Sequence, residues 1–198
     1  MRSALSASTS RRFGSALVAG VAVAALVSGC GKTTPTLPEP NPSKASAELN
    51  AGLKAQAQGQ LDSAATHFEE TLKYDPKNKY ALYNLALIDA SKSRTAEAES
   101  KYRVVLGIDP KYVPALFNLA ILMKNKGDSA EAISLYRRVL TVNPKYAAAH
   151  MNLGLLLRST GNAADGDAEV KKAIELNPQL KDPAAGTVPS PSAGASRP

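Results

Sequence analysis

The chain has 198 residues, of which 44% are apolar, 21% are charged and 5% are aromatic, with no Trp and a single Cys. This length suits one modest domain with tails and does not suit a multi-domain enzyme. One Cys excludes an intrachain disulfide framework, and the two His, His67 and His150, leave little material for a metal site. The net charge is +7, yet residues 45–178 hold 17 Lys and Arg against 15 Asp and Glu. We therefore predict no metal, no cofactor and no nucleic-acid partner.

The first 29 residues have the pattern of an export signal. Three Arg in the first dozen positions precede an uncharged stretch over residues 13–31, whose apolar centre has the length of a signal-peptide core. The stretch ends in Val27-Ser28-Gly29-Cys30, which resembles the lipobox of bacterial lipoproteins. The resemblance implies that residues 1–29 are a lipoprotein signal peptide, that Cys30 is lipidated, and that the protein is anchored at the bacterial cell membrane, facing outside the cytoplasm.

Alternatives to this interpretation stay open. An uncleaved transmembrane helix with an incidental Cys would just have the length to span a bilayer. Export by the general or the twin-arginine route, and residence in an inner or an outer membrane, are not distinguished by these residues.

Two segments rich in Pro frame the central part of the chain. Residues 30–44 combine the lipidated Cys with a linker in which Pro35, Pro38, Pro40 and Pro42 alternate with polar residues. Residues 182–198 have a similar composition and are predicted to be a disordered tail.

A repeat of 34 residues is the strongest pattern in the chain. It is marked by the dipeptides Asp75-Pro76, Asp109-Pro110, Asn143-Pro144 and Asn177-Pro178. Each copy contains two amphipathic stretches, such as Tyr112 to Lys126 and Asp128 to Val142, and Asp128 is a predicted helix N-cap. The pattern predicts an all-α fold, an α-solenoid of four tandem helix-turn-helix repeats at approximately 45–78, 79–112, 113–146 and 147–180.

Residue types recur at fixed places within the repeat. Small residues that allow close helix packing are Gly52, Ala86, Ala120 and Gly154, and in the second helices Ala64, Ala98, Ala132 and Gly166. Large residues that can fill the space between hairpins are Phe68, Tyr102, Tyr136 and Val170. This pattern resembles the tetratricopeptide repeat (TPR) family over residues 45–178.

An Asn recurs in every first helix, as Asn50, Asn84, Asn118 and Asn152. Because Asn is a mediocre helix former, its return needs a reason. The resemblance implies that Asn84, Asn118 and Asn152 lie on a concave face and bond the backbone of an extended peptide, since an amide offers donors and an acceptor. The alternative is that these Asn bond neighbouring helices and stiffen the scaffold.

Two apolar rows accompany the Asn residues. Tyr83, Phe117 and Met151 precede them by one position, and Leu87, Ile121 and Leu155 follow by three. The resemblance places both rows in a partner-binding groove, with Lys124 and Arg158 at its rim; packing between helices and ordinary solvated charges are the alternatives. Leu49 and Leu53 stand where a carboxylate-clamp subgroup would need Lys and Asn, which disfavours that ligand class.

Together these features predict a lipid-anchored extracytoplasmic adaptor that binds a peptide or partner protein and helps to assemble an envelope complex. The alternatives are a self-associating scaffold without a peptide ligand and, as a minor one, an unrecognised enzyme; no catalytic residue is predicted because no catalytic motif is present. Lys101 is expected on the outer face, where its replacement by Ala should change neither folding nor binding.

Overall fold

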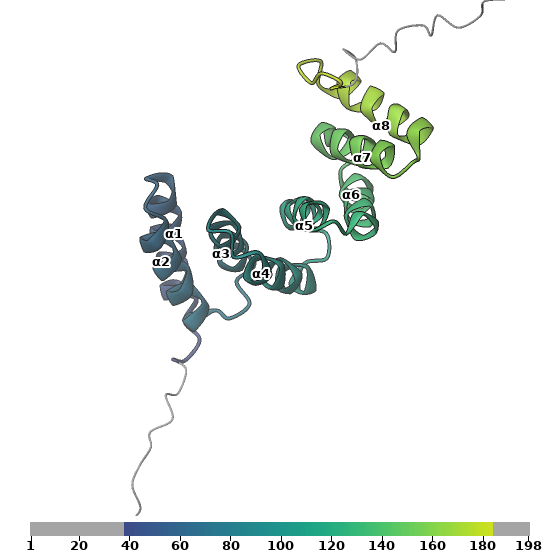
Figure 1. Ribbon diagram of the computed structural model, residues 1–198. Helices are drawn as coiled ribbons and strands as arrows, with labels where there is room; N and C mark the ends of the chain where they lie inside the picture. Colours follow the sequence, from purple (N-terminus) through teal and green to yellow (C-terminus); the bar gives the residue numbers. More distant parts are fainter. Residues whose placement is uncertain (1–37, 184–198) are drawn as a thin grey trace, which may run out of the picture. The chain divides into compact units, whose positions relative to one another are not determined.

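The computed structural model describes residues 38–183, which fold into eight α-helices without strands (Figure 1). The helices are α1 (Pro42–Ala57), α2 (Leu61–Tyr74), α3 (Lys79–Ser91), α4 (Thr95–Ile108), α5 (Val113–Lys126), α6 (Ser129–Val142), α7 (Ala147–Ser159) and α8 (Ala163–Leu176). Successive pairs form repeats 1 to 4, and the second helix of each repeat also packs against the first helix of the next. The predicted all-α solenoid of four helix-turn-helix repeats is confirmed. The signal segment, Cys30 and the tail beyond residue 183 lie outside the described residues.

The predicted linker and the predicted tail each include residues that the structure places in the folded part of the chain. Helix α1 begins at Pro42, inside the predicted linker, because the Asn41 side chain accepts a 3.0 Å hydrogen bond from the Lys44 amide and a Pro is well suited to the first helical position. At the other end, the Asp182 carboxylate accepts hydrogen bonds of 2.7 and 2.8 Å from Arg158. The ordered chain therefore continues through the first residues predicted as a tail.

Helix boundaries follow local signals. The Asp128 side chain accepts a 3.0 Å hydrogen bond from the Glu131 amide, which confirms the predicted N-cap of α6. Helices α4, α6 and α8 end next to the Asp-Pro and Asn-Pro dipeptides, because the residue before a Pro is driven out of the helical region.

The core lies between the two layers of helices in successive repeats. Its largest cluster joins repeats 2, 3 and 4 through residues such as Tyr102, Leu116, Leu119 and Tyr136, all nearly inaccessible to solvent. The small residues predicted at the helix crossings are buried in every repeat. In repeat 4 the two backbones themselves approach closely, since a Cβ added to Gly154 would lie 2.7 Å from the Gly166 carbonyl oxygen.

One turn departs from the others. Gly59, Gly127 and Gly161 occupy equivalent turns with φ of 74°, 87° and 89°, but repeat 2 has Ser93 there, with φ of 60°. A left-handed backbone is strained for any residue with a Cβ.

Across residues 38–183, none of the helices is long and apolar enough to cross a lipid bilayer.

Candidate functional site: a pocket between repeats 2 and 3

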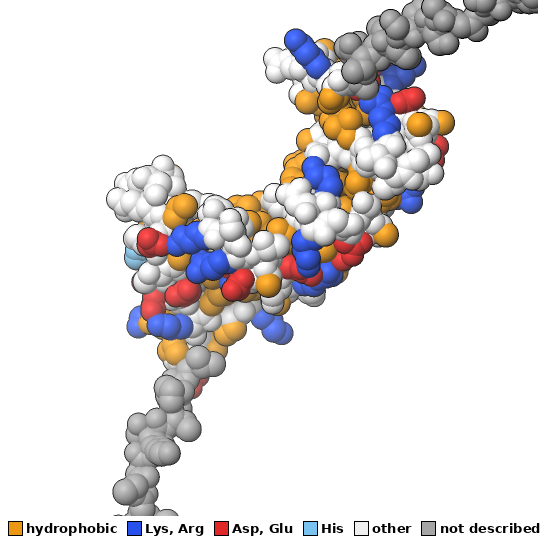
Figure 2. All heavy atoms as spheres, in the orientation of Figure 1, with side chains coloured by type: hydrophobic (Ala, Val, Ile, Leu, Met, Phe, Trp, Pro, Cys, Tyr) orange, Lys and Arg blue, Asp and Glu red, His pale blue; other side chains and the backbone are white. Residues whose placement is uncertain are grey.

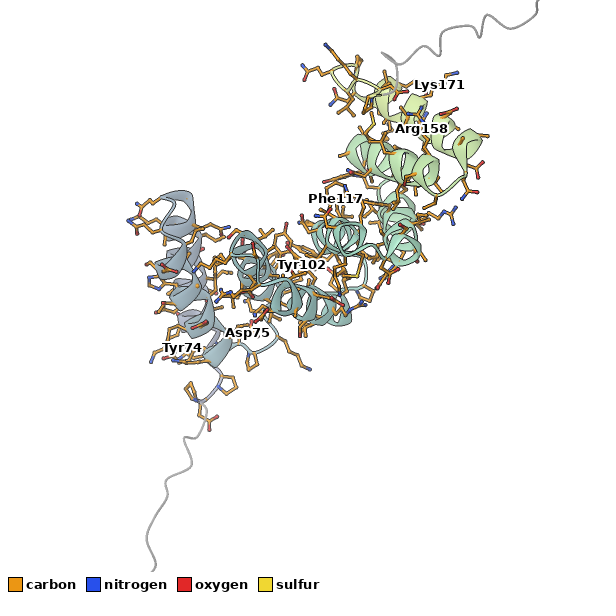
Figure 3. The ribbon with its side chains drawn as sticks, in the orientation of Figure 1. Tyr74, Asp75, Tyr102, Phe117, Arg158 and Lys171 are labelled. Atoms are coloured by element: carbon orange, nitrogen blue, oxygen red, sulfur yellow. The ribbon has the colours of Figure 1, made fainter. Side chains whose placement is uncertain are left out.

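A pocket of about 320 Å³ lies between α3 and α5, the first helices of repeats 2 and 3, and residues of α4 also line it. Its lining residues are Leu87, Ala90, Ser93, Thr95, Tyr102, Asn118, Ile121, Leu122, Asn125 and Lys126. Three of the residues predicted for a groove, Leu87, Asn118 and Ile121, therefore meet at one place. Tyr102, which lies where α3, α4 and α5 come together (Figure 3), joins them from the second helix.

The predicted Asn row uses its amide donors within the protein. The Nδ2 atoms of Asn84, Asn118 and Asn152 donate to the carbonyl oxygens of Tyr80, Pro114 and Ala148, one turn earlier, at 2.8, 3.0 and 2.9 Å. Because a carbonyl only accepts, these bonds fix the orientation of each amide. The three Oδ1 atoms accept no hydrogen bond from any residue between 38 and 183. Asn50, in repeat 1, is exposed.

Asn118 also joins two repeats. Its Nδ2 donates a second hydrogen bond, 2.9 Å long, to the hydroxyl of Tyr83 on α3. Burial raises the pKa of Tyr83 above its ordinary value, whereas the bond from Asn118 lowers it. The Asn118 amide thus has a scaffold contact of the kind that the alternative interpretation expects, and it keeps a carbonyl acceptor beside the pocket.

The first apolar row packs partly into the protein. The ring of Tyr83 contacts Tyr112 and Tyr102 at centroid distances of 5.4 and 6.0 Å. Phe117 contacts Tyr146 and Tyr136 at 5.0 and 5.8 Å. Both rings remain half-buried.

The other predicted groove residues, Met151, Leu155, Lys124 and Arg158, lie outside the lining of this pocket. Met151 is buried in the cluster of repeat 4, and Leu155 packs at the edge of that cluster. Lys124 lies near the end of α5, half-buried and outside the pocket lining. Arg158 is neither at the rim of the pocket nor an ordinary solvated charge, because Asp167 at 2.6 Å and Asp182 at 2.7 Å hold its guanidinium near the end of the array.

Sequence reasoning missed most of the polar lining of the pocket. Ser93, Thr95, Asn125 and Lys126 contribute two hydroxyls, an amide and an ammonium. The Lys126 ammonium also bonds the Glu99 carboxylate at 2.5 Å. Two signals were present in the sequence: Ser93 interrupts an otherwise regular series of Gly, and Asn125 follows Asn118 by two helical turns.

Charges on the described helices are mixed. Figure 2 shows Lys and Arg side chains interspersed with Asp and Glu on the face in view. Lys101, expected to be a solvated residue, instead lies 2.7 Å from the nearly buried carboxylate of Asp89, which also bonds Arg94 at 2.6 Å. Removing Lys101 would leave a buried carboxylate with one fewer partner, so we now expect Lys101→Ala to lower stability, where the sequence alone predicted no effect. Nowhere in residues 38–183 do three His, Cys, Asp or Glu side chains gather as metal ligands would.

Comparison with known families decides what kind of repeat this is. The sequence profile of the tetratricopeptide repeat matches residues 49–113 and 117–180, well over half of the chain. The chain belongs to the tetratricopeptide repeat family. TPR proteins are generally non-enzymatic scaffolds that bind protein partners. No curated protein matches this sequence.

Solved TPR structures share the fold. A MamA crystal structure is 19% identical, with a TM-score of 0.64, over 70% of this chain and 81% of its own. MamA from Desulfovibrio magneticus is 20% identical, with a TM-score of 0.64, over 69% of this chain and 77% of its own. A TPR protein from Parabacteroides merdae is 23% identical, also at 0.64, and the match spans 70% of this chain and 55% of that one. At these identities the likeness establishes the fold alone.

Proposed function

We propose that this TPR protein is a lipid-anchored adaptor, held outside the cytoplasm by Cys30, that binds an extended segment of a partner protein along its first helices and helps to assemble an envelope complex. The TPR fold supports the scaffold function, and the lipobox-like residues 27–30 support the anchor.

The single observation that carries the binding proposal is the row of unpartnered Asn Oδ1 atoms. An extended peptide presents backbone N–H groups that need acceptors once water is removed. In Asn84 and Asn152 the amide nitrogen is oriented by its own helix, which leaves the oxygen available without a change of side-chain conformation. The half-buried rings of Tyr83 and Phe117 provide apolar contact beside this row.

Asn84→Ala tests the row most cleanly. This change removes the Asn84 Oδ1 acceptor, and the nitrogen of the same side chain bonds only a carbonyl of its own helix. We therefore expect the affinity for the partner protein to fall by about 1 to 3 kcal/mol if the peptide contact is buried, with little change in melting temperature. Tyr83→Phe is the matched control, because it removes one bond of Asn118 while the bond to Pro114 still orients that amide. It should lower stability by about 0.5 to 1.5 kcal/mol and spare binding.

The assay is quantitative capture of crosslinked partners from membranes by the wild type and by these variants. Lys145→Ala, an exposed change, is the neutral control. Equal capture by the wild type and by Asn84→Ala combined with Phe117→Ala would remove the groove hypothesis. Sedimentation of the protein would then test self-association.

The anchor has a separate test. Cys30→Ser removes the thiol that would be acylated, so we expect an uncleaved precursor that no longer carries lipid. Mass spectrometry of the wild-type protein checks this, and a mature chain that still begins at Met1 with an unmodified Cys30 would contradict the anchor.

A further inference from the structure

The pocket between α3 and α5 contains more hydrogen-bond donors than its own residues use. Tyr102 is only 1% exposed and lines the pocket, and its hydroxyl bonds no residue in the described part of the chain. Burial raises the pKa of Tyr102, so the hydroxyl remains a donor under physiological conditions. The hydroxyl is not among the fully buried atoms of the described residues, so the small surface that Tyr102 exposes includes this donor, which opens into the pocket. A ligand oxygen that enters the pocket can take the place of water on this hydroxyl.

The other polar groups in the lining strengthen this excess of donors. Ser93 and Thr95 add hydroxyls, and Asn125 adds an amide. Lys126 is the one cation in the lining, which contains no Asp or Glu. Its bond to Glu99 uses one of three ammonium protons, so further donors remain.

Charges just outside the lining are already compensated. The Asp89 carboxylate, which lies near Tyr102, is held by Lys101 at 2.7 Å and Arg94 at 2.6 Å. Glu99 is shared by Lys126 at 2.5 Å and Arg103 at 3.1 Å. An anion that enters the pocket therefore meets hydrogen-bond donors and the Lys126 ammonium. The nearby carboxylates of Asp89 and Glu99 are each paired with two cations.

The walls of the pocket are apolar. Leu87 and Ala90 line the pocket from α3, and Ile121 and Leu122 line it from α5. Such walls suit methylene groups, whereas the donors suit a terminal oxygen. A Glu side chain combines both, since its two methylenes can contact the walls and its carboxylate accepts several charge-assisted hydrogen bonds.

We propose that this pocket receives a glutamate side chain of the bound segment, with Tyr102, Asn125 and Lys126 donating to its carboxylate. The inference rests on the proposed function, since the segment is the partner bound along the first helices. Asn118 Oδ1, on the same lining, accepts the backbone N–H of that glutamate or its neighbour. The glutamate position thereby fixes the register of the segment along the repeats.

Selection of peptides tests the proposal while the partner protein is still unidentified. The immobilised full-length chain selects from a random peptide library displayed on phage, and we expect Glu to be enriched at one position of the bound peptides. In a synthetic copy of a selected peptide, Glu→Gln should weaken binding about tenfold, the value of a charged over a neutral hydrogen bond.

The variants locate the effect. Tyr102→Phe and Lys126→Met should each reduce the enrichment of Glu and shrink the difference between the Glu and Gln peptides. The matched controls change the equivalent residues of other repeats. Tyr136, equivalent to Tyr102, has a buried hydroxyl without a partner, and Lys92, equivalent to Lys126, pairs with Asp62 between repeats 1 and 2. The control variants are Tyr136→Phe and Lys92→Met. Both controls should keep the preference for Glu.

Each contrary outcome has a distinct meaning. Peptides that bind without enriched Glu, or with equal affinity for the Glu and Gln forms, overturn the pocket assignment and leave the adaptor function intact. A preference for Glu that survives Tyr102→Phe and Lys126→Met also overturns it. Failure to select any peptide overturns the proposed peptide binding, and the pocket assignment with it.

Discussion

Gly154→Ala sets helix propensity against packing in repeat 4. In repeats 2 and 3 the same position holds Ala86 and Ala120, both fully buried, so the repeat pattern suggests that Ala is acceptable. Ala in a helix interior is also favoured over Gly by about 1 kcal/mol. The structure predicts the opposite result. A Cβ at residue 154 would lie 2.7 Å from the Gly166 carbonyl oxygen and 2.9 Å from the Val170 nitrogen.

The cost follows from which atoms must move. Two of the three nearest contacts are backbone atoms of α8, so rotation of a side chain cannot relieve them. Overpacking of this kind costs about 1 to 3 kcal/mol, and the propensity gain offsets about 1 kcal/mol, which leaves a net loss of about 0 to 2 kcal/mol. Because repeat 4 has a neighbour on one side only, the loss should appear as local opening of α7 and α8.

Hydrogen exchange of the full-length protein measures this opening helix by helix. We expect amide protection in α7 and α8 to fall, while protection in α3 and α4 changes little. Gly107→Ala in α4 is the matched control, since nothing lies within 4 Å of its added Cβ; it should raise stability by up to about 1 kcal/mol. Increased protection of α8 in Gly154→Ala, as in the Gly107→Ala control, would refute the packing argument.

Three further predictions concern single side chains. Ser93→Gly should raise the melting temperature by relieving the left-handed strain, a gain of about 0.5 to 1 kcal/mol, while the lost hydroxyl weakens binding of the Glu peptide. Tyr136→Phe removes a buried hydroxyl without a partner, so urea unfolding should show unchanged or higher stability; a loss above about 1 kcal/mol would reveal an unseen partner. Hydrogen bonds from Lys126 and Arg103 lower the pKa of Glu99, so its contribution is present above the ordinary glutamate pKa and disappears as pH falls through the lowered one; Glu99→Gln should flatten that acid limb in melting curves.

The fold was predictable because its signals repeat. Four Pro dipeptides at a spacing of 34 residues set the ends of the second helices, and small residues at two fixed places set the helix crossings. One repeat read alone would be ambiguous, whereas four copies predict the same hairpin. The boundaries at Pro42 and Asp182 were harder, because each depends on one side chain: Asn41 caps α1 and Asp182 reaches back to Arg158.

The candidate site was predictable only in part. The periodic residues Leu87, Asn118 and Ile121 were identified because they return in each repeat, and they do line one pocket. Arg158 shares its repeat position with Lys124, yet a contact with Asp182 at 2.7 Å, outside the repeats, decides its environment. Ser93 and Asn125 have no counterpart of the same type in the other repeats, and a search for recurrence passes over features that occur once. Lys126 recurs only as Lys92, which pairs with Asp62.

The two interpretations of the Asn row, peptide binding and scaffold stiffening, apply to different atoms of the same amide. The nitrogen of Asn118 bonds Pro114 and Tyr83, which serves the scaffold, and its oxygen remains unpartnered beside the pocket. The bonds of the nitrogen hold the oxygen in place, and an acceptor that is already held loses less side-chain entropy when a peptide binds. Stability and affinity should therefore be coupled at Asn118 and separable at Asn84, where the amide bonds only its own helix. A variant at residue 118 alone cannot distinguish the two functions; the comparison of Asn84→Ala with Tyr83→Phe can.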